Sequence, residues 1–358
     1  MRKILVLEGD GIGPEIVGAS IQVLEAVSAT FGLDLHFEFD DVGFASLEKY
    51  GTTLREELLQ RSKTYDGIIL GTQSHMDYPP VSEGGRNISL GFRIGLDLYA
   101  NIRPARTRRA LLKPGQKEMD LIIVREATEG FYPDRNMYLG GPSEMMPTPD
   151  MALSIRKITK QGSERIARKA FELAMQRRKR VTAIHKVNSF KLTDGLFLDQ
   201  VAEVAKEFPE VEVDDQLVDS MTAHLVRNPG RFDVVVATNF YGDILSDLAS
   251  ELSGSIGLAG SMMASQTHCC AQAQHGSAPD IAGTDRANPS SMILSSAMLL
   301  DWMGHHLDDE SLINASRLIE EAIDETLADP AKRTWDLGGT TGCVEFGRLV
   351  AEACTVRT

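Results

Sequence analysis

Short apolar runs alternate with amphipathic stretches along most of the chain. Residues 3–7 form an apolar run that stops at Gly9, which is the pattern of a buried strand. An amphipathic helix is predicted from Pro14 to about Phe31, and proline suits its first turn because no N–H partner is needed there. The same alternation predicts further strands at residues 35–39, 65–71, 119–126, 181–186, 212–218 and 233–238, and further helices at 163–178, 193–207, 288–303 and 311–328. This order is typical of an α/β fold.

Composition narrows the possible classes of protein. A length of 358 residues favours two domains, and the 42% hydrophobic and 25% charged residues are ordinary for a soluble globular protein. The net charge of −14 argues against nucleic acid as a partner, because that partner requires a basic surface. The basic run at 177–180 ends a predicted helix, and we expect a solvated helix end there rather than a binding patch.

The cysteines and the apolar runs indicate the cellular compartment in which the protein is expected. Cys269 and Cys270 are adjacent, but no second spaced pair accompanies them, so buried thiols are favoured over a metal cluster. Cysteines are scarce, which fits a reducing compartment. No apolar run reaches the length of a signal peptide core or a membrane span. These features predict a cytoplasmic protein without membrane association.

Two aspartates are the strongest local signal of chemistry. Asp243 and Asp247 follow the buried strand at 233–238 and are spaced i,i+4, so a helix would present both carboxylates on one face. Their like charges repel and need a cation or a strong donor nearby. An all-oxygen site of this kind suits Mg²⁺ or Mn²⁺. A solvated helix face, with an aspartate stabilised by the helix dipole, explains the same residues equally well.

Several other residues are candidates for substrate or cofactor binding. The turn at 9–15 (GDGIGPE) lacks the third glycine of a dinucleotide-binding motif, and a tight strand-to-helix turn remains an equal alternative. Arginine forks bind carboxylates bidentately, so three arginines in one cleft would recognise a di- or tricarboxylic acid. The candidates are Arg93, Arg103 and Arg125. Lys186 and Asn188 end a predicted strand, where α/β proteins place their sites, and Tyr132 closely follows Arg125.

Taken together, these motifs resemble the β-decarboxylating dehydrogenase family of isocitrate, 3-isopropylmalate, homoisocitrate, tartrate and D-malate dehydrogenases. The likeness spans essentially the whole chain. It rests on the segments at 9–15, 97–104, 125–132, 186–188, 218–226, 239–250, 275–289 and 336–342. The resemblance implies the two-domain α/β fold of isocitrate and isopropylmalate dehydrogenases, which is not the usual Rossmann type. Residues 1–100 and 255–358 would form the cofactor-binding domain, and 101–254 a small domain with the dimerisation elements and the metal-binding aspartates.

The resemblance also implies roles at the matched positions. Arg93, Arg103 and Arg125 would hold the substrate carboxylates, and Asn188 would contact substrate and cofactor. Asp243 and Asp247 would bind Mg²⁺ or Mn²⁺ together with Asp219 of the partner subunit. Tyr132 and the partner subunit's Lys186, assisted by Asp219, would be the acid–base pair. The adenosine pocket for NAD would be lined by His275, Gly276, Ala278, Asp280, Ile281 and Asn288.

The active site implied by the resemblance is shared across a homodimer. The loop at 133–150 is rich in Pro, Gly and Met and too polar to be core, which makes it a candidate arm or dimer element. The implied reaction is oxidation of a (2R)-2-hydroxy acid by NAD followed by loss of CO₂. A catalytically silent, regulatory relative is the alternative from another class, and it is disfavoured because every matched catalytic residue is present.

The substrate's C3 substituent is the open question. The segments 71–75 and 258–274 depart from the family pattern, and this puts the substrate in doubt rather than the reaction. Isopropylmalate enzymes place leucines before Arg93, whereas this chain has Asn87 and Ser89 there. We therefore expect a polar or small C3 group, as in isocitrate, with 3-isopropylmalate and D-malate or tartrate as alternatives. Asn87 could instead simply cap the helix that begins near Ile88.

Overall fold

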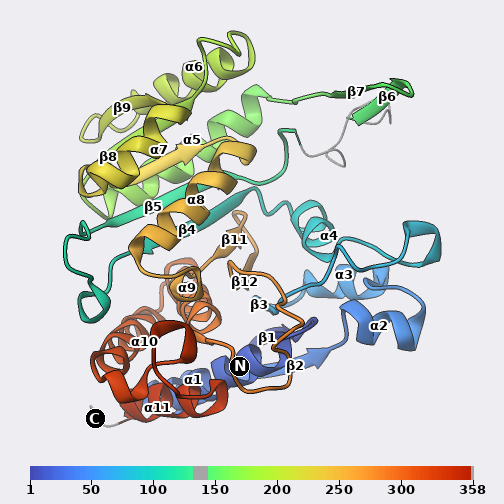
Figure 1. Cartoon of the computed structure of the whole chain (residues 1–358), viewed down its shortest axis with the longest axis vertical. Helices are drawn as coiled ribbons and strands as arrows, with labels where there is room; N and C mark the ends of the chain where they lie inside the picture. Colours follow the sequence, from blue (N-terminus) through green and yellow to red (C-terminus); the bar gives the residue numbers. More distant parts are fainter. Residues whose placement is uncertain (132–143, 356–358) are drawn as a thin grey trace. The chain divides into compact units, whose positions relative to one another are not determined.

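The computed structural model describes residues 1–131 and 144–355 and confirms the α/β fold (Figure 1). The Cα atoms cluster into two compact units. The first consists of Met1–Leu98, Arg108–Leu112 and Gly254–Thr358, and the second of Tyr99–Thr107 and Lys113–Ser253. The predicted assignment of these parts to a cofactor-binding domain and a domain with dimerisation elements stays a prediction.

The first unit is built on strands in the order β2-β1-β3-β12-β11. All neighbours run parallel except β11 and β12, which form an antiparallel pair. The strands are β1 (Arg2–Leu7), β2 (Leu35–Asp40), β3 (Gly67–Leu70), β11 (Met262–Ala264) and β12 (Cys269–Gln272). The helices are α1 (Gly13–Phe31), α2 (Gly43–Tyr50), α3 (Glu56–Ser62), α4 (Ile88–Gly95), α9 (Ser290–Leu307), α10 (Glu310–Ala328) and α11 (Cys343–Thr355). Figure 1 shows α1, α10 and α11 packed side by side.

The second unit has strands in the order β4-β5-β10-β8-β9, in which only β4 and β5 are antiparallel. The strands are β4 (Ala100–Arg106), β5 (Asp120–Glu126), β8 (Arg180–His185), β9 (Glu212–Leu217) and β10 (Val234–Ala237). The helices are α5 (Lys160–Met175), α6 (Thr193–Ala205), α7 (Val218–Arg227) and α8 (Asn239–Ser253). All four residues of β10 are buried, as its apolar sequence predicts, and this places the start of α8 beside the middle of the sheet.

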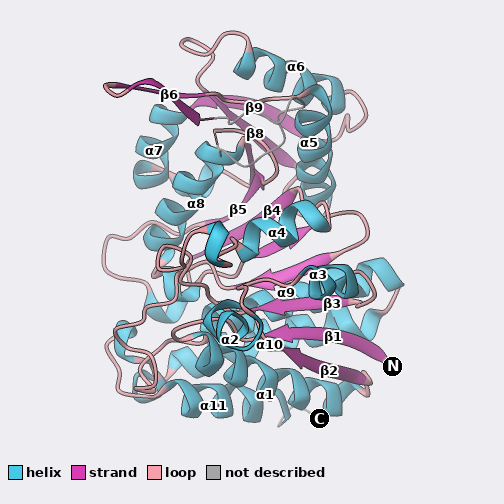
Figure 2. Ribbon diagram, turned by 90° about the vertical axis from the view of Figure 1, so that its right-hand side faces the viewer, coloured by secondary structure: helices cyan, strands magenta, loops and turns pink. Residues whose placement is uncertain are grey.

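Part of the predicted loop at 133–150 is instead a β-hairpin. Strand β6 (Glu144–Thr148) pairs with β7 (Met151–Ser154), and every residue of both strands is exposed. In both ribbon views the hairpin extends away from the other elements of its unit (Figure 1, Figure 2). Residues 132–143, which include Tyr132 and the first part of the predicted arm, lie outside the described residues.

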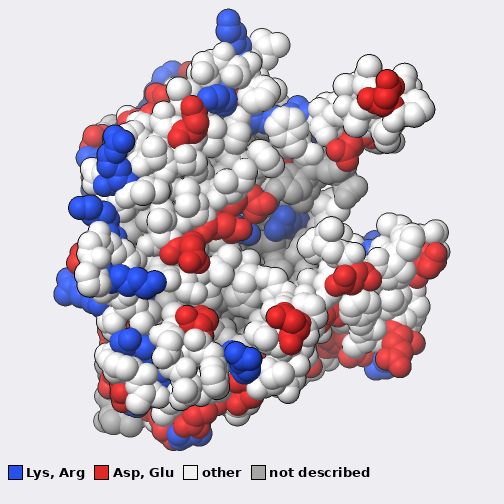
Figure 3. All heavy atoms as spheres, viewed as in Figure 1, with Lys and Arg blue, Asp and Glu red and all other residues white. Residues whose placement is uncertain are grey.

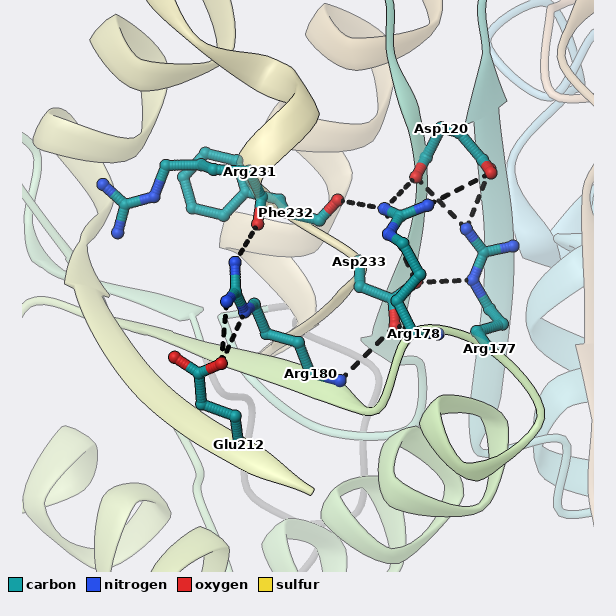
Figure 4. Close-up of polar contacts among 8 residues, drawn as sticks. All are labelled: Asp120, Arg177, Arg178, Arg180, Glu212, Arg231, Phe232 and Asp233. Atoms are coloured by element: carbon teal, nitrogen blue, oxygen red, sulfur yellow. Dashed lines mark hydrogen bonds and ion pairs between the residues drawn. The ribbon is translucent and has the colours of Figure 1, made fainter. Parts of the chain in front are cut away.

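The basic run at 177–180 is held by ion pairs, which differs from the solvated helix end that we expected. Helix α5 ends at Met175, and Asp233, which is 1% exposed, accepts hydrogen bonds from Arg177 Nε at 2.8 Å and from the Arg178 backbone at 2.9 Å (Figure 4). Burial alone would raise the pKa of Asp120, but the hydrogen bond and charge of Arg177 outweigh it and lower that pKa. The arginines therefore join α5 to the starts of β5 and β10.

All four cysteines are buried, as the sequence predicts. Burial raises the pKa of Cys270 to about 12, which keeps its thiol protonated and unreactive at neutral pH. No helix among the described residues is long and apolar enough to cross a membrane.

Candidate active site

Two arginines of the second unit are buried on neighbouring strands. Arg103 lies on β4 and Arg125 on β5, and their side chains are only 10% and 3% exposed. A buried guanidinium needs charged or polar partners, because removing a charge from water is costly. Arg103 Nη1 lies 3.3 Å from one carboxylate oxygen each of Asp243 and Asp247, and Arg125 Nη1 contacts the same oxygen of Asp243. The structure therefore brings two predicted substrate-binding residues together with two predicted metal ligands.

Helix α8 presents its acidic side chains as a stripe. Asp243, Asp247 and Glu251 follow one another at intervals of four residues, so they share one face of the helix. Acidic side chains form a row over α8 in Figure 3. The side chains of Asp243 and Asp247 are 37% and 54% exposed, although both contact Arg103. The repulsion expected from the sequence is thus relieved by buried guanidinium groups, while the carboxylates stay accessible from solvent.

A glycine lets α8 approach β5 closely. A Cβ atom at Gly242 would lie 2.7 Å from Cβ of Arg125, so a larger residue would push the helix away from the strand. Asn239, the first residue of the helix, accepts hydrogen bonds from Arg125 at 2.7 and 3.0 Å and donates one to the backbone oxygen of Glu129 at 2.9 Å. These contacts fix the guanidinium plane of Arg125 relative to α8.

Lys186 and Asp219 form an ion pair at the end of β8. Nζ of Lys186 donates to a carboxylate oxygen of Asp219 at 2.6 Å, and this hydrogen bond lowers the pKa of the Asp219 carboxyl. Asp219 lies in the first turn of α7 and its side chain is 63% exposed, whereas that of Lys186 is 25% exposed. Asn188 is exposed on the loop that follows. Two predicted acid–base residues therefore meet at the surface of the chain.

A buried carboxylate holds the backbone beneath this ion pair. Asp194, on α6, is fully buried, accepts a hydrogen bond from the backbone N–H of Lys186 and pairs with Arg156. The hydroxyl of Tyr241 lies 3.2 Å from the same carboxylate. Burial raises the pKa of Tyr241 to about 12, so its hydroxyl remains a donor at neutral pH. Arg156 also donates to Oγ1 of Thr238 at 2.9 Å, which ties the end of β10 to the same network.

Sequence reasoning missed four of these polar residues: Asn239, Ser246, Asp194 and Arg156. Ser246 accepts a hydrogen bond from Arg103 at 2.8 Å, and its place three residues after Asp243 could have indicated the shared helix face. Asp194 and Arg156 lie 38 positions apart in sequence. No local pattern joins them, and only the fold brings them together.

In the first unit, the glycine-rich turn is held by other loops. Gly11 has a φ of +61°, and a Cβ atom there would lie 2.0 Å from the backbone oxygen of Ser277. The carboxylate of Asp10 is 6% exposed and accepts backbone hydrogen bonds from Phe44 at 2.8 Å and Ser74 at 3.1 Å. These contacts give the turn a structural role at the carboxyl ends of β1 and β3, where parallel sheets place their ligands.

The loop at 275–289, which carries the predicted adenosine site, is anchored to neighbouring elements. Asn288 donates through Nδ2 to Asp336 at 2.9 Å and accepts from the backbone that starts α9. The backbone N–H of Gly283 donates to Glu15 on α1. The loop is thus fixed to its unit by side chains from distant parts of the chain.

The other predicted adenosine residues lie along this loop at different depths. Gly276 and Asp280 are exposed, whereas His275, Ala278 and Ile281 are partly buried. Burial lowers the pKa of His275, so its imidazole is neutral at pH 7. The same loop thus carries a neutral ring at His275 and an exposed carboxylate at Asp280.

The predicted substrate-binding residues of the first unit lie at α4. Asn87 caps the helix, because its side-chain oxygen accepts a hydrogen bond from the backbone of Leu90 at 2.9 Å. Ser89 and Arg93 are one turn apart on the helix, and Nε of Arg93 lies 3.1 Å from the sulfur of Met263. Because Arg93 belongs to the first unit and Arg103 to the second, the convergence of the three predicted arginines stays a prediction.

The carboxylates on α8 fit a hard divalent cation. Asp243 and Asp247 supply oxygen ligands on one helix face, which is the donor type that Mg²⁺ and Mn²⁺ prefer. Within the described part of the chain, they do not join Asp219 as a group of three ligand atoms within 4.8 Å. Within one chain, two of the three predicted metal-binding carboxylates therefore lie together, and the third, Asp219, is paired with Lys186.

Comparison with known protein families identifies the class to which this chain belongs. The chain matches the model of the family described as isocitrate/isopropylmalate dehydrogenase over residues 3–350. It belongs to that family, whose members are β-decarboxylating hydroxy-acid dehydrogenases that generally use NAD(P) and a divalent metal. The resemblance inferred from the sequence motifs is confirmed.

The similar proteins are named after different substrates. The chain is 39% identical over 356 residues to the 3-isopropylmalate dehydrogenase of Archaeoglobus fulgidus, covering 98% of this chain and 99% of that one. It is 42% identical to the isocitrate/homoisocitrate dehydrogenase of Thermus thermophilus, covering 98% of each. The crystal structure of isocitrate dehydrogenase from Methylococcus capsulatus matches with a TM-score of 0.86 at 38% identity, covering 99% of this chain and all of that one. The fold and reaction class are thereby shown, and the substrate is not settled.

The buried Asp194–Arg156 pair gives a prediction about stability. Asp194→Asn leaves the Arg156 charge buried without its partner, so we expect the free energy of unfolding to fall by about 3–5 kcal/mol. Urea denaturation measures this change. Asp199→Asn, an exposed position on the same helix, is the control and should stay within about 0.5 kcal/mol of wild type. Equal unfolding midpoints for the two variants would contradict the structural role of the pair.

Proposed function

We propose that the chain catalyses NAD-dependent oxidative decarboxylation of a (2R)-2-hydroxy acid of the 3-substituted malate type, with Mg²⁺ or Mn²⁺. The observation that carries this proposal is the joining of Arg103 and Arg125 to Asp243 and Asp247. The guanidinium groups can bind anions and the carboxylates can bind a cation. A site for a hydroxy acid that chelates a metal requires both kinds of group close together. The α-hydroxy carboxylate would bind the cation while its carboxylates pair with the arginines.

Each residue has a chemical task in this proposal. Arg93, Arg103 and Arg125 bind and orient the substrate carboxylates, and the low exposure of the last two excludes competing water. When bound, the cation supplies positive charge for the oxygen anion that develops on the substrate, and NAD supplies the hydride acceptor. Lys186, paired with Asp219, takes the hydroxyl proton.

The second half of the reaction releases CO₂ and needs a proton. Oxidation converts the C2 hydroxyl to a ketone, and the C–C bond to the β-carboxylate then breaks with its electron pair left on the enol carbon. Tyr132 returns a proton to that carbon in this proposal. Asn188, which is exposed two residues after Lys186, contacts the substrate and the cofactor in this proposal.

The homodimer with shared sites belongs to the proposal. Lys186 and Asp219 lie at the surface of the chain, so they can serve a site on another copy. The hairpin β6–β7 exposes apolar side chains although two strands alone are only marginally stable in water. These side chains are Met145, Met146, Met151 and Leu153. A second copy that covers this hairpin would remove that apolar surface from water.

One assay separates the proposed activity from a catalytically silent regulatory chain. Purified protein with Mn²⁺ and NAD is given isocitrate, homoisocitrate, 3-isopropylmalate, D-malate and tartrate in turn, and NADH absorbance is followed. We expect turnover of at least one of them, with isocitrate or another polar or small malate favoured. Absence of NADH formation with the whole panel would reject the enzymatic proposal.

The metal site gives the next prediction. Asp247→Asn removes one anionic ligand, so a much higher Mn²⁺ concentration should be needed for half-maximal activity. The matched control is Glu251→Gln, one turn further along the acidic stripe, which should leave the Mn²⁺ requirement unchanged. Full wild-type activity in excess chelator would show that the aspartates do not bind a required metal.

The exposed Asp280 gives a prediction about the cofactor. Its carboxylate should accept hydrogen bonds from the adenosine ribose and repel a 2′-phosphate, so kcat/KM should be higher with NAD than with NADP. Asp280→Ala should reduce the ratio of the two values. Steady-state kinetics with both cofactors measure it, and a wild-type preference for NADP would refute the assignment.

Subunit mixing tests the shared site. In a heterodimer of Lys186→Ala and Asp243→Asn chains, one of the two shared sites carries neither substitution. Random exchange of equal amounts should therefore recover about a quarter of wild-type activity, while each variant alone is nearly inactive. If Lys186 serves its own chain's site, proven heterodimers would remain inactive, because each site would carry one lesion.

A further inference from the structure

Three side chains with metal-binding atoms meet in the first unit. Glu15 lies in the first turn of α1, Asp285 lies on the loop at 275–289, and Cys343 is the first residue of α11. The Sγ atom of Cys343 and one carboxylate oxygen from each of the two acids lie within 4.8 Å of one another. The three residues are far apart in sequence, so no spacing pattern predicts this cluster.

The thiol of Cys343 is the buried member of the cluster. Its side chain is 0% exposed, and among the described residues its Sγ atom makes no hydrogen bond. Burial, and after it the charges of Glu15 and Asp285, raises the pKa of this thiol. Two carboxylates that face a buried sulfur atom create a negative potential there, which a bound cation would neutralise.

Both carboxylates are held by the surrounding backbone. One oxygen of Glu15 accepts a hydrogen bond from the backbone of Gly283, while Oε2 is buried and has no hydrogen-bond partner in the described part of the chain. A buried oxygen without a donor is costly. Oδ1 of Asp285 accepts from the backbone of Val344 at 2.9 Å, and a Cβ atom at Gly342 would lie 2.0 Å from Oδ2. The glycine therefore makes room for the carboxylate.

Capping of α11 explains only part of this arrangement. The side chain and the backbone oxygen of Asp285 accept hydrogen bonds from the first two N–H groups of the helix, at 2.9 and 3.0 Å. That role requires neither a thiol at Cys343 nor the buried oxygen of Glu15 without a donor. A divalent cation would provide a partner for both groups and would offset the charges of the two carboxylates.

We propose that Glu15, Asp285 and Cys343 form a Zn²⁺ site. A thiolate together with carboxylate oxygens suits Zn²⁺, whereas Mg²⁺ and Mn²⁺ prefer oxygen ligands alone, such as those of Asp243 and Asp247. Asp285 is exposed, so water can reach the cation and supply a fourth ligand. Binding breaks the S–H bond of Cys343, forms an S–Zn bond and releases the proton to solvent, without a change of oxidation state.

A bound Zn²⁺ would join three segments of the first unit: the start of α1, the loop at 275–289 and the start of α11. The unfolded chain does not hold these segments together, so the cation would stabilise the folded unit. The same loop carries the predicted adenosine residues, and its backbone would be fixed by one more ligand. The proposed site does not depend on the proposed activity, and its test needs no turnover.

Cobalt reports directly on a thiolate ligand. Metal-free protein is titrated with Co²⁺ as a spectroscopic substitute for Zn²⁺. We expect a thiolate-to-cobalt charge-transfer band in the near ultraviolet that disappears when Zn²⁺ is added. Cys343→Ser should abolish the band, whereas the matched control Cys354→Ser, at another buried cysteine of α11, should retain it. Asp247→Asn should also retain it, because the carboxylates of α8 offer no sulfur.

A second variant keeps the thiol and tests a carboxylate. Glu15→Gln retains an oxygen for the backbone of Gly283 but removes the charge, so it should weaken Co²⁺ binding about ten-fold or more. Thermal unfolding checks that each variant is folded, and Zn²⁺ should raise the unfolding midpoint of wild type more than that of Cys343→Ser. If Cys343→Ser does not fold, Glu15→Gln carries the test. Folded wild type without a thiolate band, a band that persists in Cys343→Ser, or unchanged affinity in Glu15→Gln overturns the proposal.

Discussion

The second unit depends on the need to neutralise two guanidinium groups that its sheet buries. Arg103 and Arg125 lie on β4 and β5 with almost no exposed surface, and an unpaired charge at such a depth would be strongly destabilising. Helix α8 supplies the partners, and Gly242 allows it to come close enough to do so. The same pairing keeps two like-charged aspartates on one helix face. The ion pairs that stabilise this unit therefore use the same atoms as the proposed chemistry. A ligand that binds these carboxylates or guanidinium groups replaces their partners within the protein.

A second buried pair positions the proposed proton-transfer residue. Asp194 and Arg156 connect the start of α6, the end of β10 and the backbone of Lys186. The lysine side chain is left to pair with Asp219 at the surface. A proton-transfer residue requires a fixed backbone and an accessible side chain. The backbone of Lys186 is held in place, while its amine can reach a substrate.

Periodicity and motifs predicted much of the fold and part of the site. Apolar runs located the strands because a buried parallel strand is apolar on both faces, as in β10. The i,i+4 spacing of Asp243 and Asp247 predicted a shared helix face, but their pairing with buried arginines depends on tertiary packing. The hairpin β6–β7 was missed because its two strands are short and fully exposed, so no buried apolar run marks them in the sequence. Asn87 was predicted either to cap a helix or to bind substrate, and the two roles are compatible. Its side-chain oxygen caps α4, which leaves its amide nitrogen for other partners.

The loops at the strand ends of the first unit are bonded to one another rather than only to solvent. The hydroxyl of Ser74 donates to that of Ser277 at 2.8 Å, Thr72 donates to the backbone oxygen of Asp10 at 2.8 Å, and Gly11 has no room for a side chain beside Ser277. A change in one loop therefore strains the other two. To transfer substrate preference from one relative to another, these three segments must therefore be exchanged together. In evolution, a substitution in one of them must be accompanied by compensating substitutions in the other two.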